Sequence, residues 1–372
     1  TFEDYGLFTQ VEQLNKTALK AHGLDKSGHL YKVNSFDFHR FEDTIKLADD
    51  PDYNQTAFEG MLEIKGDSDH TKLIEMLDAL NDDTQKIDDV LDTYFDTENL
   101  VYWMAFQILT GNCDTQNRNC YLYSPLNSNT WYFLDWDNDG MLRKLELSLT
   151  GFSDYASWER GASNYWGNVL FNRALRSKSF RSELDRAVKD LRSYLTETRL
   201  TKMIKHYREV TESLVFASPD IDNLPVTKDQ YEQIAAAIPS EIEENYKSFR
   251  ESFKKPMPFY IGVPQIDNGK LRINWDASYD FEARDIRYTV ELARDYAISD
   301  VVFKAEDVLL PEVTSDAPDT GQYFVRVRAT NSDGYTQDAF DYYVTDDGKQ
   351  YGMKCFYVQD GGKVVEDTYE EG

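Results

Sequence analysis

Hydrophobic residues recur at helical spacing over much of the first two thirds of the chain. The clearest segment is Thr97–Thr110, where Asp96 stands at the capping position, Glu98 lies in the first turn and Gly111 follows the last residue. A side-chain acceptor before a helix and a glycine after it are the residues those positions favour. The segment therefore predicts a helix whose apolar stripe packs into a core, made of Leu100, Val101, Met104 and Ile108.

The same spacing predicts further helices between polar stretches. They are Lys16–His22, Asp69–Leu80, Ile87–Phe95, Phe180–Tyr194, Glu197–Phe216 and Thr227–Ile238. The acidic stretch Asp43–Gly60 is typical of a solvated surface loop. Ser153–Asn168 is rich in aromatic residues without clear periodicity, which favours a loop packed by its own side chains.

Alternating apolar and polar positions predict strands at Tyr5–Glu12, His29–Asn34 and Trp131–Leu134. After Lys254 the helical periodicity stops, and short strands begin at Leu271–Asp276, Ile286–Leu292 and Tyr323–Thr330. Tyr351–Val358 and Lys363–Val365 predict a final hairpin before an acidic end.

The strand spacing of this last part resembles a fibronectin type III domain, a two-sheet antiparallel sandwich. Trp275 stands where such a domain has an early core tryptophan, and Tyr323 where it has a tyrosine that closes a corner.

Two clusters of carboxylates and carboxamides bracket a predicted hairpin between residues 111 and 140. Asp114 and Asn119 follow the helix Thr97–Thr110, and Asp135, Asp137 and Asp139 alternate at the exit of the strand Trp131–Leu134. If the hairpin folds back, it brings the later aspartates toward the earlier pair. Hard oxygen donors gathered in this way suit Mg²⁺, Mn²⁺ or Ca²⁺ better than zinc.

A calcium loop is an alternative interpretation of the later cluster. Asp135, Asp137, Asp139, Gly140 and Glu146 occupy the ligand and glycine positions of an EF-hand loop. An EF-hand, however, needs a helix entering the loop, whereas the residues before Asp135 are aromatic and favour a strand. The pattern therefore favours a strand end with a metal over a true EF-hand.

Oxygen ligands of this kind also serve phosphoryl transfer, and Asp114-x-x-x-x-Asn119 matches half of the protein-kinase catalytic loop, although Asn112 and Cys113 replace its His-Arg. At this point the chain resembles the spore-coat CotH kinases, a family of atypical protein kinases. Four segments in family order carry the resemblance, which spans residues 1–254: Tyr5–Asn15, His29–Val33, Gly111–Tyr123 and Phe133–Asp139.

The resemblance implies roles for individual residues. Asp114 would accept the proton of the substrate hydroxyl, Asn119 would bind Mg²⁺, and Asp135 or Asp137 would supply the second metal ligand. Lys32 and Glu12 would lie near the nucleotide phosphates. The implied cofactors are ATP with Mg²⁺ or Mn²⁺, and the implied substrate is a Ser or Thr of a secreted or surface protein.

The expected fold class is α+β, with three parts. Residues 1–254 form a kinase-like domain that consists mostly of a helical C-terminal lobe, residues 255–346 an all-β fibronectin type III-like sandwich, and residues 347–372 a hairpin and tail. In the family the nucleotide-binding lobe begins upstream of Thr1, so we expect the first domain to lack its N-terminal part, in a mature or trimmed chain.

Composition limits the partners. The 372 residues carry a formal net charge of −27, which argues against sequence-independent binding to nucleic acid or to anionic membranes. No apolar run reaches the length of a membrane span. The family resemblance implies a bacterial extracellular, cell-surface or spore-surface location. Two alternatives stay open: a non-catalytic extracellular scaffold or adhesion module with a structural Ca²⁺, and, more weakly, a glycosidase that uses two carboxylates.

Overall fold

The structure is a computed structural model that describes residues 4–151, 156–346 and 348–367. The chain divides into two compact units. The first comprises residues 1–153 and 167–247, and the second comprises residues 154–166 and 248–372. The domain boundaries predicted from the sequence, at residues 254 and 346, stay predictions.

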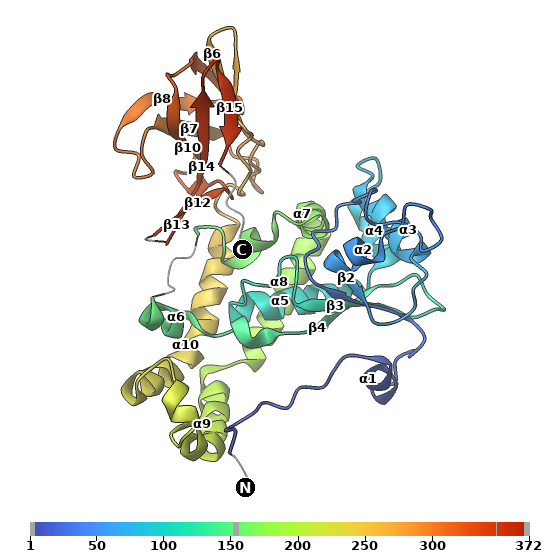
Figure 1. The fold of residues 1–372 in the computed structure, drawn as a ribbon. Coiled ribbons are helices and arrows are strands. Elements are labelled where there is room, and N and C mark those ends of the chain that lie inside the picture. The colour runs from blue at the N-terminus through green and yellow to red at the C-terminus, as the bar shows by residue number, and fades with distance from the viewer. Residues whose placement is uncertain (1–3, 152–155, 347, 368–372) are drawn as a thin grey trace. The chain divides into compact units, whose positions relative to one another are not determined.

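A four-stranded antiparallel sheet forms one layer of the first unit (Figure 1). Its strand order is β2-β1-β3-β4, with β1 at His29–Val33, β2 at Leu62–Ile64, β3 at Cys120–Ser124 and β4 at Tyr132–Asp135. The hairpin β3–β4 pairs Cys120 with Asp135 and Tyr121 with Leu134. The predicted return of the later aspartates toward Asn119 is therefore confirmed.

The α-helices of this unit are joined by loops. These helices are α1 (Lys16–Ala21), α2 (Gln55–Met61), α3 (Thr71–Asn81), α4 (Ile87–Tyr94), α5 (Thr97–Thr110), α6 (Lys144–Thr150), α7 (Val169–Arg176), α8 (Lys178–Tyr194), α9 (Glu197–Val215) and α10 (Lys228–Ser252), the last of which continues into the second unit. Two predictions were wrong. Tyr5–Glu12 forms no strand, and the supposed loop Asp43–Gly60 contains the start of α2.

The central helix of the first unit is α5, which packs against α8 and β4. The ring of Trp103 on α5 lies 4.9 Å from that of Phe133 on β4 and stacks on Phe171 of α7 at 5.8 Å. Near the start of α5, Asn99 accepts from the backbone N–H of Phe133 (2.7 Å) and donates to its carbonyl oxygen (3.0 Å). Aromatic packing and this amide pair fix the register of the helix against the strand that leads to Asp135.

The second unit is built from antiparallel sheets (Figure 1). One has the order β5-β6-β9 and another β15-β14-β10-β7-β8, with β11 also paired to β10 and a separate pair β12-β13. The strands are β5 (Gln265–Asp267), β6 (Lys270–Asn274), β7 (Ile286–Ala293), β8 (Val301–Val308), β9 (Glu312–Asp316), β10 (Gly321–Asn331), β11 (Thr336–Asp338), β12 (Tyr342–Thr345), β13 (Gly348–Tyr351), β14 (Met353–Gln359) and β15 (Lys363–Glu366). The three strands predicted between Leu271 and Thr330 and the final hairpin are confirmed.

A hydrophobic core lies between these sheets and contains Trp275, which is buried. The hydroxyl of Tyr323 donates to the carbonyl oxygen of Asp319, four residues earlier, at 3.0 Å. This bond satisfies the one polar atom of an otherwise buried ring.

Residues 156–166 belong to the second unit although they are distant from it in sequence. Trp158 packs against Phe340 (ring centroids 4.9 Å apart), and Trp166 stacks on Tyr279 at 5.4 Å. The predicted self-packed loop Ser153–Asn168 is thus corrected over its described residues, because these tryptophans pack on residues far along the chain. Across the described part of the chain, no helix combines the length and the apolarity needed to cross a membrane.

Candidate functional site

The candidate site lies where α5 ends and the β3–β4 hairpin ends. Gly111 closes α5 in the left-handed conformation (φ +68°), and the loop that follows carries Asn112 to Asn119 into β3. On the other side, the backbone N–H of Leu142 donates to the carbonyl oxygen of Thr110 at 2.8 Å. The helix end therefore holds both polar loops, one before β3 and one after β4.

Asp114 and Asn119 contact each other directly. The Nδ2 of Asn119 donates to Oδ2 of Asp114 at 2.9 Å, and Arg118 lies 3.5 Å from the other carboxylate oxygen. Asn119 adopts a positive φ of 58°, a conformation that asparagine tolerates better than most residues. Desolvation raises the pKa of the Asp114 carboxyl, Arg118 and Asn119 oppose this shift, and Asp137 and Asp139 add to it. Both aspartates after β4 therefore lie close enough to Asp114 to act on its charge.

Asp135 is held by a buried amide network. Gln107 on α5 is fully buried, and its Nε2 donates to Oδ1 of Asp135 (2.9 Å) and to Oδ1 of Asn138 (3.2 Å). Asn112, also buried, donates to Oε1 of Gln107 (3.0 Å) and to Oδ1 of Asn138 (3.4 Å). Desolvation raises the pKa of Asp135, although its side chain remains exposed on one side, and the bond from Gln107 opposes this shift.

Asp137 and Asp139 lie in the turn that follows β4. Asp137 is exposed and left-handed (φ +56°), and the short helical turn Asn138–Gly140 follows it. A strand, not a helix, enters this loop, and the carboxylate of Glu146 pairs with Arg143 at 2.9 Å. The loop therefore lacks the helix–loop–helix form of an EF-hand, in agreement with the interpretation favoured from the sequence.

The two residues predicted near the phosphates lie in different places. Lys32 on β1 pairs with Tyr121 in the sheet, and its Nζ lies 5.7 Å from the centre of the Trp136 ring. Asp135 pairs with Cys120, the residue next to Tyr121 on β3. Because successive side chains of a strand point to opposite faces of a sheet, the side chain of Asp135 lies on the opposite face from Lys32. Glu12 is exposed and contacts His22 at 2.8 Å. Among the described residues, neither Lys32 nor Glu12 has a recorded contact with Asp114 or Asp135.

The donor atoms can be compared with what a metal requires. In the described part of the chain, no three His, Cys, Asp or Glu side chains gather closely enough to form a metal centre by themselves. The available donors are the carboxylates of Asp135 and Asp137 and the amide oxygen of Asn119. Mg²⁺ is commonly bound by one or two carboxylates and completed by water and substrate phosphates, so this set fits Mg²⁺ or Mn²⁺ bound together with a nucleotide.

Sequence reasoning missed the amides around Asp135. In the sequence, Gln107 lies within an apolar helix and Asn138 lies between two aspartates. Asn112 draws attention only because it departs from the kinase loop. One signal was available, since a glutamine in the last turn of a buried helix needs partners for all its polar atoms. The identity of those partners depends on the fold.

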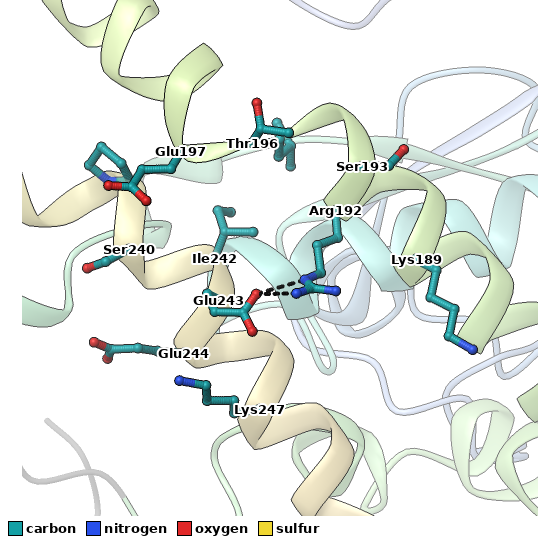
Figure 2. A pocket seen from close by; sticks show the side chains of 12 residues that line it. Lys189, Arg192, Ser193, Thr196, Glu197, Ser240, Ile242, Glu243, Glu244 and Lys247 are labelled. Atoms are coloured by element: carbon teal, nitrogen blue, oxygen red, sulfur yellow. Dashed lines mark hydrogen bonds and ion pairs between the residues drawn. The ribbon is translucent and has the colours of Figure 1, made fainter.

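A cavity of about 570 Å³ lies elsewhere in the first unit, between α8, α9 and α10 (Figure 2). The guanidinium of Arg192 faces Glu243 there, with Nε 2.8 Å from the carboxylate. None of the predicted site residues lines it, and its basic and acidic side chains offset each other: Lys189, Arg192, Lys247, Glu197, Glu243 and Glu244. We therefore place the candidate site at the hairpin rather than in this cavity.

Comparison with known proteins identifies the family to which this chain belongs. Residues 2–249, most of the chain, match the model of the CotH kinase protein family, and the chain therefore belongs to that family. Among solved structures, the twitchin kinase region from C. elegans matches with 18% identity and a TM-score of 0.20, over 26% of this chain and 20% of that chain. A TM-score this low does not define a shared fold. The comparison with curated proteins found no match.

Proposed function

We propose that the chain is an atypical protein kinase that transfers the terminal phosphoryl group of ATP, with Mg²⁺ or Mn²⁺, to Ser or Thr hydroxyls. One observation carries the proposal. In a member of the CotH kinase protein family, the bonded pair Asp114–Asn119 lies beside the end of the strand that presents Asp135. A proton acceptor, an amide ligand and a carboxylate ligand at the end of one hairpin are what phosphoryl transfer requires.

In this proposal Asp114 accepts the proton of the substrate hydroxyl. Its carboxylate is exposed, so a hydroxyl can reach it, and the raised pKa makes it a better proton acceptor than an ordinary aspartate. Asn119, Asp135 and Asp137 supply the oxygen ligands. A bound Mg²⁺ would neutralise charge on the phosphates. Lys32 and Glu12 are not assigned to this metal-bound nucleotide, because Lys32 projects from the face of the sheet opposite to Asp135 and Glu12 contacts His22.

The proposed substrate is a secreted or surface protein at the bacterial cell or spore surface, by analogy with the family. We further propose that the β-rich part of the second unit is a fibronectin type III-like module. The two sheets with orders β5-β6-β9 and β14-β10-β7-β8, the buried Trp275 and the bond of Tyr323 to Asp319 support this assignment.

Nucleotide binding is the first test. Mn²⁺ with ATP at about a hundredfold over its dissociation constant should stabilise the protein by roughly 2.7 kcal/mol, which a thermal shift detects. The Asp135→Asn variant should lose that shift. Stabilisation by Ca²⁺ alone, with no response to ATP, would instead identify a non-catalytic, metal-stabilised module.

Catalysis is tested by Asp114→Asn, which keeps the shape of the side chain and an oxygen that can accept from Asn119. We expect phosphoryl transfer to fall by roughly 10²–10⁴-fold, the range for loss of a general base, while the Mn²⁺–ATP thermal shift remains. Asp52→Asn serves as the matched control, because Asp52 is an 84% exposed carboxylate of the same unit, and it should leave transfer unchanged. Transfer that survives in Asp114→Asn would refute the assigned role.

A further inference from the structure

The amide of Gln107 covers one oxygen of the Asp135 carboxylate, and this has a consequence for metal selection. We propose that Gln107 is a positioning residue that restricts Asp135 to one-oxygen coordination and thereby makes the site prefer Mg²⁺ or Mn²⁺ over Ca²⁺. The inference rests on the proposed metal-dependent function and deepens it, because it concerns the same site.

The burial of Gln107 is the first step. It is 0% exposed in the last turn of a helix whose neighbouring positions are apolar. Burying a carboxamide without partners is expensive, so such a residue persists where its hydrogen bonds are satisfied. Here both N–H groups and the oxygen of Gln107 are used, by Asp135, Asn138 and Asn112.

The direction of every bond in the network follows from Asp135. An ionised carboxylate only accepts, so Gln107 must present Nε2 to it. The Oε1 of Gln107 then faces Asn112, which must present Nδ2 in turn. Asn112 also donates to Asn138, whose Oδ1 accepts hydrogen bonds from both Gln107 and Asn112. With Asp135 ionised, the network therefore has one consistent orientation.

Coordination geometry links this network to the metal. The 2.9 Å bond from Gln107 takes one of the two lone-pair positions of Oδ1 of Asp135, so Oδ2 is the oxygen more open to a cation. Mg²⁺ is octahedral and accepts single carboxylate oxygens, whereas Ca²⁺ takes more ligands and often binds both oxygens of one carboxylate. A carboxylate with one oxygen already bonded therefore disfavours Ca²⁺ more than Mg²⁺. Asp137 has no such partner among the described residues, so Asp135 is the ligand with a fixed orientation.

The same helix provides a matched control. Asn99 is also an amide of α5 that bonds to β4, but it lies about two helical turns before Gln107, and its partners are the backbone N–H and carbonyl of Phe133. Replacing Asn99 or Gln107 removes a helix–strand amide contact in either case. Only the replacement of Gln107 uncovers an oxygen of Asp135.

The experiment uses Mn²⁺ as the probe and measures its binding to the full chain with ATP by electron paramagnetic resonance. Mg²⁺ or Ca²⁺ is then added as a competitor. Wild type should release Mn²⁺ at a lower concentration of Mg²⁺ than of Ca²⁺. Gln107→Leu and the unbranched Gln107→Met should weaken Mn²⁺ binding by roughly tenfold, as expected when a positioning partner of a ligand is lost. Both should also lower the preference for Mg²⁺ over Ca²⁺, whereas Asn99→Leu should lower the melting temperature and keep the wild-type preference.

The outcomes separate this inference from the proposed function. A wild type that binds no Mn²⁺ with ATP overturns the proposed function and this inference with it. A wild type that binds Mn²⁺, together with a folded Gln107→Leu or Gln107→Met of unchanged Mg²⁺ to Ca²⁺ preference, overturns the inference alone. If Asn99→Leu changes the Mg²⁺ to Ca²⁺ preference as much as the Gln107 variants do, the inference is also overturned. The effect would then follow from weaker packing of α5.

Discussion

At the scale of single residues, the buried amides around Asp135 leave little space. A Cβ atom added to Gly140 would lie 2.7 Å from Oδ1 of Asn112, closer than real contacts of this kind. That oxygen is buried and accepts no hydrogen bond among the described residues. Asn112 cannot retreat without breaking its bond to Gln107. The absence of a side chain at position 140 is therefore a packing requirement of the site.

We predict that Gly140→Ala lowers the free energy of unfolding by about 1–3 kcal/mol, the usual effect of overpacking. Gly60→Ala is the control, because Gly60 lies within α2 and a Cβ there meets nothing within 4 Å. It should stabilise the protein by about 0.5–1 kcal/mol through helix propensity. Urea unfolding of the two variants measures both effects. A Gly140→Ala protein as stable as wild type would show that Asn112 moves freely.

Sequence reasoning at this scale found the residues that form local patterns. Asp114, Asn119 and Asp135 stand in short motifs whose spacing is visible in one dimension. Gln107 has no such pattern, because its partners Asp135 and Asn138 reach the end of α5 only through the hairpin. Its role could not be predicted from its neighbours in sequence.

At the scale of secondary-structure elements, local signals predicted well where they were sufficient. The bounds of α5 agree with prediction because Asp96 bonds the N–H of Asn99 and Gly111 ends the helix, both within a few residues. The predicted strand Tyr5–Glu12 failed because alternation supplies no partner strand. The helical pattern of Thr227–Ile238, which runs on toward Phe249, forms one long helix, α10, because Pro239 interrupts one backbone bond while buried residues such as Phe249 anchor the rest.

A buried histidine joins β1 to α3. The ring of His70 is completely buried just before α3, and its two nitrogens meet the hydroxyls of Tyr31 (2.9 Å) and Tyr53 (3.2 Å). Burial lowers the pKa of His70 to about 4, with Asp69 acting against this shift. The folded protein therefore favours the neutral form of the His70 ring.

This burial makes stability depend on pH. The unfolded chain binds the His70 proton below about pH 6.5, whereas the folded chain resists it down to about pH 4. Stability from this group is therefore fully present above about pH 6.5 and is lost as pH falls toward 4, by roughly 3 kcal/mol in total. Urea unfolding across this range should show a shallower pH dependence for His70→Phe than for wild type.

His206→Gln is the control for that measurement, because His206 is exposed on α9. The control should keep the wild-type slope, which also contains the titration of carboxylates common to all three proteins. The linkage to His70 is refuted if His70→Phe retains the full slope, even where removing the partner of Tyr31 lowers stability at every pH.

At the scale of the whole molecule, the order of elements was predicted better than their grouping. The change from helices to strands near Lys254 was visible in sequence, whereas the membership of residues 156–166 in the second unit was not. That membership depends on contacts such as Gln337 Nε2 donating to Ser157 Oγ (2.8 Å) across 180 residues. No local pattern encodes such a pairing.

The composition of the second unit predicts how a shortened chain behaves. A protein that ends at Lys254 keeps Trp158 and Trp166 but lacks Phe340 and Tyr279, the rings on which they pack. Trp166 is 6% exposed in the whole chain, so its loss of cover should shift tryptophan fluorescence to longer wavelength and increase binding of the dye ANS. The change Trp166→Ser in the shortened chain should reverse most of the dye binding, whereas the same change in the whole chain should destabilise the second unit. A shortened protein with the fluorescence of the whole chain and no dye binding would mean that Trp158 and Trp166 are covered without the residues after Lys254.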